Sequence, residues 1–220
     1  MTEDMRSNGS NPWLDIPAED YEGHMSAPDV GQAAFLSEQF AKALTTHDAA
    51  AVSLLGCATG NGLEKIDPNT TRRLLVVDIN RAYLDILDSR FTQLADILEA
   101  VEANLETFLF EEEAFTLMFG GLIFEYVALE QTLKNIAAAL QANGTFVAIL
   151  QLPSENVSMI SNTPFKSLTK VASIMRLVEP EAFVEAASAA GLVCADQTIE
   201  TLASGKSFAV ITLKKKAMSA

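Results

Sequence analysis

The hydrophobic residues of this chain follow two alternating patterns. Short, nearly continuous apolar runs, which are typical of buried parallel strands, are separated by stretches in which apolar residues recur at helical spacing. This alternation predicts an α/β domain in which helices connect the strands of a mostly parallel sheet. The runs that we assign to strands are 51–55, 74–77, 97–103, 115–119 and 145–150.

Helical spacing appears before the first strand, from about Val30 to Leu44. A second helix should follow Asn80, whose side chain can cap it. The helix between the fourth and fifth strands is expected to end at Asn143-Gly144, and Pro164 and Pro180 suit the first positions of two later helices. The buried positions that we predict are Tyr83, Leu84, Leu87, Phe91 and Leu94 for the second helix, and Leu129, Leu133, Ile136 and Leu140 for the next.

The C-terminal part has a different pattern. Two extended stretches, Leu192–Leu202 and Lys206–Leu213, are separated only by Ala203-Ser204-Gly205. A parallel crossover needs a much longer connection, so these stretches should form an antiparallel hairpin. The length of 220 residues suits one domain. The polar residues 1 to about 12 show no periodicity and predict a loose arm.

Composition narrows the range of partners. The formal net charge is −14, and the clear basic run, Lys214–Lys216, lies at the C-terminal end. Nucleic-acid binding relies on basic side chains that neutralise phosphates, so we expect no nucleic-acid partner. No apolar run is long enough for a membrane span, and we expect no membrane partner. The sequence is compatible with a homo-oligomer but does not specify one.

Cysteine and histidine usage adds two expectations. The two cysteines, Cys57 and Cys194, cannot form a disulfide framework, and the N-terminus lacks a secretory signal, so a cytoplasmic location is expected. The two histidines, His24 and His47, exclude a His-rich metal site, and we expect no bound metal.

The turn after the first strand carries the clearest chemistry. The sequence Gly56-Cys57-Ala58-Thr59-Gly60-Asn61-Gly62 leads directly from the strand into a short helical stretch. Glycines at such a turn let the backbone bend sharply and let a ligand approach its N–H groups. Asp78 ends the second strand about 20 residues further on, the offset at which an acidic residue meets ribose hydroxyls. Turn and carboxylate together favour an adenosine-bearing ligand over a plain tight turn with a surface aspartate.

At this point the chain resembles the class I S-adenosylmethionine-dependent methyltransferases, from about Val52 to the final hairpin. The segments that carry the resemblance are 54–62, 76–80, 103–105 and 115–122. It implies a Rossmann-like α/β fold with a seven-stranded, mostly parallel sheet, a C-terminal antiparallel hairpin and helices on both faces. It also implies S-adenosyl-L-methionine as cofactor. Leu54, Ala58 and Asn104 depart from the family pattern, which usually has an acidic residue, a glycine and an aspartate there.

The resemblance assigns roles along the predicted sheet edge. The first turn would hold the methionine part, Asp78 the ribose, and Asn104-Leu105 would bracket the adenine. The end of the fourth strand, Gly120-Gly121-Leu122, would pass beneath the sulfonium. The cofactor-binding residues that we predict are Tyr21, Met25, Gly56, Cys57, Ala58, Gly60, Asn61, Asp78, Ile79, Asn104, Leu105, Gly120, Gly121 and Leu122.

In many small-molecule members of the family the segment before the first strand covers the cofactor. We therefore divide the chain into an N-terminal arm with a lid helix, residues 1–45, and a methyltransferase domain, residues 46–220. Tyr21 and Met25 would cover the cofactor, while His24, with a pKa near neutrality, would be the catalytic general base. Tyr126 is expected to contact the acceptor, a small molecule. Simple attachment of the arm to the sheet is the alternative.

Two other functions fit parts of the pattern. A short-chain dehydrogenase also uses a glycine turn of this spacing, but no tyrosine of this chain is followed four residues later by the lysine of that family's catalytic pair. A non-catalytic subunit that binds S-adenosylmethionine or S-adenosylhomocysteine is the other alternative, favoured by Leu54 and by the shortage of obvious catalytic groups.

Overall fold

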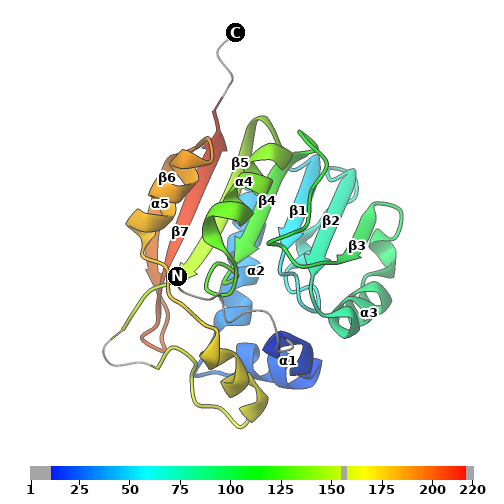
Figure 1. Cartoon of the computed structure of the whole chain (residues 1–220). Helices are drawn as coiled ribbons and strands as arrows, with labels where there is room; N and C mark the ends of the chain where they lie inside the picture. The colour runs from blue at the N-terminus through cyan, green and yellow to red at the C-terminus, as the bar shows by residue number, and fades with distance from the viewer. Residues whose placement is uncertain (1–10, 155–157, 217–220) are drawn as a thin grey trace.

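The computed structural model describes residues 11–154 and 158–216, so residues 1–10 of the expected arm lie outside the described part. The described residues form a 7-stranded sheet with the order β3-β2-β1-β4-β5-β7-β6. β7 runs antiparallel to β5 and β6, and the other pairs are parallel (Figure 1). The predicted fold class is thus confirmed. The strands are β1 (Ala51–Leu55), β2 (Arg73–Asp78), β3 (Leu98–Glu102), β4 (Phe115–Gly121), β5 (Leu140–Gln151), β6 (Leu192–Thr201) and β7 (Ser207–Lys215).

Helices cover both faces of this sheet (Figure 1). The α-helices of the described part are α1 (Ala18–Ser26), α2 (Gln32–Thr46), α3 (Arg81–Arg90), α4 (Leu129–Ala139) and α5 (Pro180–Ala189). The short 3-10 helices are η1 (Pro12–Asp15), η2 (Leu63–Lys65), η3 (Thr92–Leu94) and η4 (Lys166–Ser173). As predicted, the Asn80 side chain caps α3 by accepting from the Ala82 N–H, and Pro180 opens α5.

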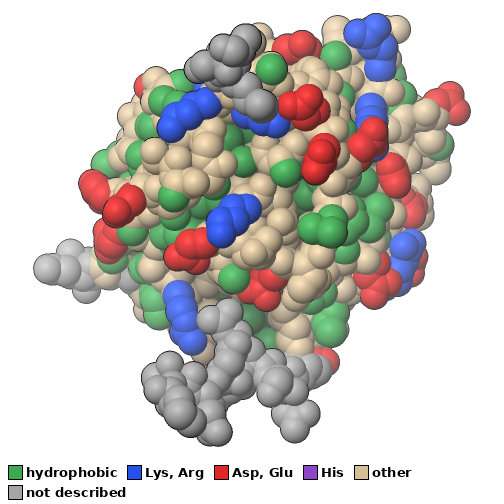
Figure 2. Space-filling model, turned by 45° about the horizontal axis from the view of Figure 1, so that its top comes forward, with side chains coloured by type: hydrophobic (Ala, Val, Ile, Leu, Met, Phe, Trp, Pro, Cys, Tyr) green, Lys and Arg blue, Asp and Glu red, His purple; other side chains and the backbone are tan. Residues whose placement is uncertain are grey.

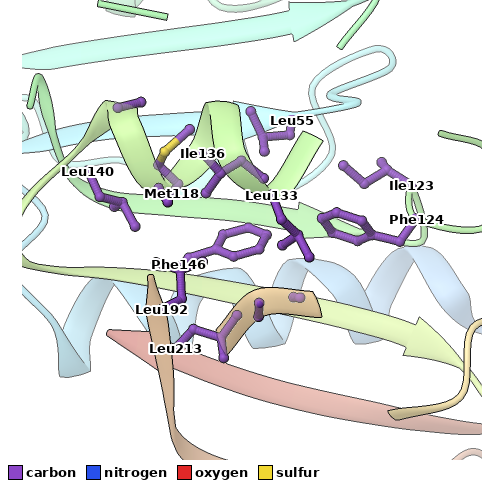
Figure 3. Close-up of a cluster of buried hydrophobic side chains, with 14 of the residues drawn as sticks. Leu55, Met118, Ile123, Phe124, Leu133, Ile136, Leu140, Phe146, Leu192 and Leu213 are labelled. Carbon is purple, nitrogen blue, oxygen red and sulfur yellow. The ribbon is translucent and has the colours of Figure 1, made fainter. Parts of the chain in front are cut away.

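The two faces have separate hydrophobic clusters. On one face Phe40 of α2 and Leu84 of α3 belong to the same cluster as Val52 of β1. On the other face Ile136 of α4 packs in a cluster with Phe183 of α5, and Figure 3 shows the part of this cluster around α4. Because each face is closed by apolar helix stripes, the central strands β1, β2, β4 and β5 are largely buried on both sides, which explains their apolar runs, whereas the edge strands β3 and β6 are partly exposed.

The short helical stretch predicted after the first turn is present as η2, and a new turn follows in which the Asp67 carbonyl accepts from the Thr70 and Thr71 N–H groups. Two other details of the predicted elements were wrong. α4 ends at Ala139 rather than at Asn143, since Leu140 already pairs with Phe115 in the sheet.

The second correction concerns Pro164, which does not open a helix. The next helix begins at Lys166 and is the 3-10 helix η4. Thr163 is held by a hydrogen bond to His24, and the ring of Phe165 occupies the space where a side chain at Gly23 would lie. Contacts with α1 therefore set the course of this segment, and the proline alone did not.

One edge of the sheet is covered by other segments of the chain. β1, β2 and β4 end at the same edge, and α1 and the segment containing η4 lie beyond it, at the bottom of Figure 1. The face seen in Figure 2 carries acidic and basic side chains interspersed. No helix among the described residues is long and apolar enough to span a membrane.

Candidate active site

The turn after β1 is shaped by residues with left-handed backbone angles. Gly56 has φ +64°, and a Cβ atom there would come within 2.4 Å of Ile123 Cγ2. Glycine is therefore required at position 56 both by its φ and by its close neighbour. Ala58 also has a positive φ, of 46°, although it carries a side chain. Left-handed backbone angles cost a non-glycine residue about 1 kcal/mol, so this turn is strained at Ala58.

Asp78 connects this turn to the helix after β2. Its Oδ2 accepts from the Ala58 N–H at 2.8 Å, and its Oδ1 accepts from the Asn80 N–H at 2.9 Å. Burial raises the pKa of this carboxyl, while its backbone hydrogen bonds act in the opposite direction. A carboxylate has about four acceptor positions, so part of its acceptor capacity remains for a ligand.

A cavity lies along the covered edge of the sheet. It is lined by segments that follow β1, β2, β3 and β4, by α1 and η4, and by the residue before β7. Of the predicted site residues, the cavity is lined by Tyr21, His24, Met25, Gly56, Ala58, Asp78, Ile79, Asn104, Leu105, Gly121, Leu122 and Tyr126.

Four predicted residues lie elsewhere. Gly60 and Asn61 line a second cavity, between α1 and the turn, and the Asn61 side chain donates to the Ala33 carbonyl. Cys57 and Gly120 belong to the lining of neither cavity. Burial raises the pKa of the Cys57 thiol, which is therefore not a ready nucleophile.

The N-terminal arm is fastened over the cavity by aromatic contacts. The ring of Trp13 meets Tyr126 edge-on at 5.1 Å and Tyr21 at 6.3 Å, and Tyr21 lies 5.6 Å from Tyr83. The Asn80 side chain also donates to the Trp13 carbonyl. Burial raises the pKa of the Tyr21 and Tyr126 phenols, so both stay neutral.

A polar contact fastens α1 to the glycine turn. Glu22 Oε1 accepts from Thr59 Oγ1 at 2.5 Å and from Arg90 Nη1 at 2.7 Å. These hydrogen bonds, together with burial acting in the opposite direction, leave the pKa of Glu22 lowered. Helix α1 is thus hydrogen-bonded to the glycine turn. Tyr21 and His24, which belong to the same helix, line the cavity.

His24 is buried, and its Nδ1 lies 2.9 Å from Thr163 Oγ1. Its pKa is lowered, first by burial and then by the positive charge of Lys206. A lowered pKa leaves the imidazole neutral near pH 7, the form that can accept a proton.

Four buried polar residues of the cavity were missed by the sequence analysis as site residues: Gln32, Glu125, Gln151 and Lys206. Glu125 Oε1 accepts from the Gln151 N–H at 2.8 Å, whereas its Oε2 is buried with no hydrogen-bond partner in the described part of the chain. Burial raises the pKa of Glu125 to about 7. Lys206 Nζ donates to the Met159 carbonyl at 2.7 Å and, at 3.4 Å, to Gln151 Oε1. Burial lowers the pKa of Lys206 to about 8.

The positions of Glu125 and Gln151 could have been noticed, because both follow the carboxyl ends of predicted parallel strands, where ligands bind in open α/β sheets. Lys206 gave no such signal, since a lysine beside a hairpin turn ordinarily faces solvent. Among the described residues, no group of three or more His, Cys, Asp or Glu side chains is arranged to hold a metal ion.

Part of the chain matches a known family of domains. A family model described as "Methyltransferase domain" matches residues 52–144. No curated protein sequence matches the chain significantly. Solved structures do match, at low sequence identity.

The structure of the [4+2]-cyclase SpnF is similar with a TM-score of 0.67 and 12% identity, covering 86% of this chain and 82% of that one. Geranyl diphosphate C-methyltransferase from Streptomyces coelicolor A3(2), solved with Mg2+, geranyl diphosphate and S-adenosyl-L-homocysteine, has a TM-score of 0.64 and 14% identity, covering 85% and 82%. An S-adenosylmethionine dependent methyltransferase from Mesorhizobium loti has a TM-score of 0.63 and 13% identity, covering 83% and 100%.

These likenesses show the fold, and the family model adds the methyltransferase domain over β1 to β5, where the glycine turn and Asp78 lie. The chain therefore carries a methyltransferase domain over residues 52–144, and its fold is similar to that of S-adenosylmethionine-dependent methyltransferases.

Proposed function

We propose that the protein transfers the methyl group of S-adenosylmethionine to a small-molecule acceptor, and that both bind in the cavity under α1. The observation that carries this proposal is the order of the lining residues along the sheet. Asn104 follows β3, Asp78 ends β2, Gly56 follows β1 and Gly121 ends β4, whereas Gln151 ends β5. Cofactor residues and buried polar groups thus adjoin in one cavity, as an in-line transfer requires.

The residues present suit the cofactor. Asp78 keeps acceptor positions for two vicinal ribose hydroxyls. Asn104 Oδ1 already accepts from the Glu106 N–H, which leaves the Asn104 amide nitrogen as a donor toward an adenine ring between Ile79 and Leu105. Gly56, Ala58 and their neighbours Cys57, Gly60 and Asn61 would form the turn around the methionine part, and Gly120-Gly121-Leu122 would pass beneath the sulfonium. When bound, S-adenosylmethionine supplies an activated methyl group.

The chain's own groups would align and deprotonate the acceptor. His24, neutral and oriented by Thr163, is the proposed general base, and Tyr126 is a proposed acceptor contact. Residues 1–45 would act as arm and lid, with Tyr21 and Met25 over the cofactor, and residues 46–220 as the methyltransferase domain. The aromatic contacts of Trp13 support this division for the described part of the arm.

We also propose that the protein acts in the cytoplasm and that its acceptor is not a nucleic acid. Cys57 and Cys194 are free, which suits a reducing compartment such as the cytoplasm. The net charge of −14 makes a nucleic-acid acceptor unfavourable.

The experiment uses Trp13, the single tryptophan of the chain, which lines the cavity. Titration with S-adenosylhomocysteine should change its fluorescence, and calorimetry should give the same affinity, whereas NAD should do neither. Labelled S-adenosylmethionine should then pass its methyl group to the small-molecule fraction of a cell extract. Absence of S-adenosylhomocysteine binding, or binding without any transfer, would overturn the proposal.

A further inference from the structure

The cavity contains a buried ammonium group for which the cofactor has no evident use. Lys206 is 3% exposed, and within the described residues its Nζ is hydrogen-bonded to neutral oxygens only, the Met159 carbonyl and Gln151 Oε1. Gln151 is also held by Gln32, whose Nε2 donates to the same Oε1 at 3.4 Å, and Gln151 Nε2 donates to the Met159 carbonyl. These bonds fix the position of the ammonium group at the wall of the cavity.

No carboxylate of the described residues forms an ion pair with Lys206. Glu125 is the acidic residue connected to this cluster. Its carboxylate is hydrogen-bonded to the Gln151 N–H and not to Lys206. Buried charges in proteins are ordinarily paired, because desolvation of an unpaired charge is costly. The missing counter-ion can therefore come from a ligand in the cavity.

The surroundings limit the kind of anion. Lys206 is the one lysine or arginine that lines the cavity within residues 11–154 and 158–216. A phosphate or diphosphate would bring more negative charge than this single ammonium balances. The side chains of Ile160, Leu168, Val171 and Met175 line the same cavity and favour an apolar ligand body.

The charge of Lys206 lies some distance along the sheet from the atoms that would react. Lys206 precedes β7, two strand positions from β4, where the sulfonium would lie, and neighbouring strands are about 4.8 Å apart. A group bound to Lys206 would thus lie on the order of 10 Å from the reacting methyl group. That group would anchor the acceptor, and a different atom of the acceptor would receive the methyl group.

We infer that the methyl acceptor is a small, largely apolar monocarboxylate whose carboxylate is bound by Lys206 and Gln151. This inference rests on the proposed function, since it concerns the acceptor end of the same cavity. Lys206 acts here as a binding residue, and His24 keeps its proposed role at the reacting atom.

The test begins with the full chain saturated with S-adenosylhomocysteine, so that loss of cofactor binding is detected first and separately. Monocarboxylates from acetate to octanoate, with benzoate and phenylacetate, are then titrated against their primary amides, followed by Trp13 fluorescence and calorimetry. An ionic hydrogen bond to a buried ammonium should make at least one carboxylate bind about 10- to 100-fold tighter than its amide.

Lys206→Met should abolish this preference and leave the affinity for S-adenosylhomocysteine unchanged. Lys134→Met, at an exposed position of α4, is the matched control and should keep the preference. Equal binding of acids and amides, no binding of any acid to the S-adenosylhomocysteine complex, or a preference that survives Lys206→Met overturns the inference. If Lys206→Met fails to fold, the comparison of acids with amides in the unaltered protein still decides.

Discussion

Asp78 Oδ2 accepts a hydrogen bond from the backbone N–H of Ala58 at 2.8 Å, and this contact couples the end of β2 to the turn after β1. The same carboxylate accepts from the Asn80 N–H at the start of α3. Two of the segments around the proposed cofactor site are therefore positioned by one side chain. Its role is structural before any ligand binds, and it also lines the cavity.

Asp78→Asn should weaken both the fold and cofactor binding. An amide oxygen can accept from only one of the two N–H groups, and the amide NH2 would oppose the other, which should cost about 1–3 kcal/mol of unfolding free energy. Affinity for S-adenosylhomocysteine should fall about tenfold or more. Urea unfolding and calorimetry measure the two effects. Asp88→Asn, on the exposed side of α3, is the control and should change neither. An unaltered affinity in Asp78→Asn would remove Asp78 from the cofactor site.

Ala58→Gly should stabilise the protein. Its φ of +46° lies in the left-handed region, where glycine avoids the steric cost that alanine meets. Glycine also gives the unfolded chain more freedom, which offsets about 0.5 kcal/mol or more of this relief, so the net gain should be small, up to about 0.5 kcal/mol. Ala182→Gly, inside α5, should instead lose about 0.5–1 kcal/mol. Urea unfolding compares the two variants, and a destabilised Ala58→Gly would mean that the turn is not strained at this residue.

His24→Gln should lower the rate of methyl transfer about 100-fold or more, because general-base catalysis contributes at least that much where it operates. Affinity for S-adenosylhomocysteine should stay nearly unchanged. Labelled-methyl transfer to the active small-molecule fraction measures the rate, and His47→Gln, at the end of α2 and outside the cavity, is the control. Normal transfer by His24→Gln would refute the assignment of His24 as the base.

Glu125 should make stability depend on pH. Burial raises its pKa to about 7 in the folded protein, above its ordinary value of 4.5. Between these two values the folded state binds more protons than the unfolded state, so the contribution of Glu125 is full below pH 4.5 and is lost as pH rises through about 7. Glu125→Gln should therefore lose less stability than the unaltered protein between pH 5 and pH 8, by about 1–3 kcal/mol.

Urea unfolding at both pH values measures this difference. Glu130→Gln, at an exposed position in the first turn of α4, is the matched control and should keep the original pH dependence. The same pH dependence in Glu125→Gln and in the unaltered protein would contradict the prediction.

Much of the architecture followed from local pattern. Apolar runs located the central parallel strands because burial on both faces leaves few polar positions, and the short connection at Ala203-Ser204-Gly205 fixed the hairpin. The glycine turn and Asp78 were predicted as site residues because a nucleotide-type ligand needs particular residue types at a particular spacing. Element ends were less accurate, as at Leu140, where pairing with Phe115 overrode the helical stripe.

The sequence by itself determined the central strands and the terminal hairpin, since each depends on periodicity or on short spacing, and it pointed to the edge at which we propose that the cofactor binds. Only the tertiary structure decided which polar side chains share the cavity. Glu125, Gln151 and Lys206 come from three separate segments, and their environment depends on long-range burial. The pKa values of Glu125 and Lys206 shift because folding removes water from them, and no local pattern encodes that desolvation.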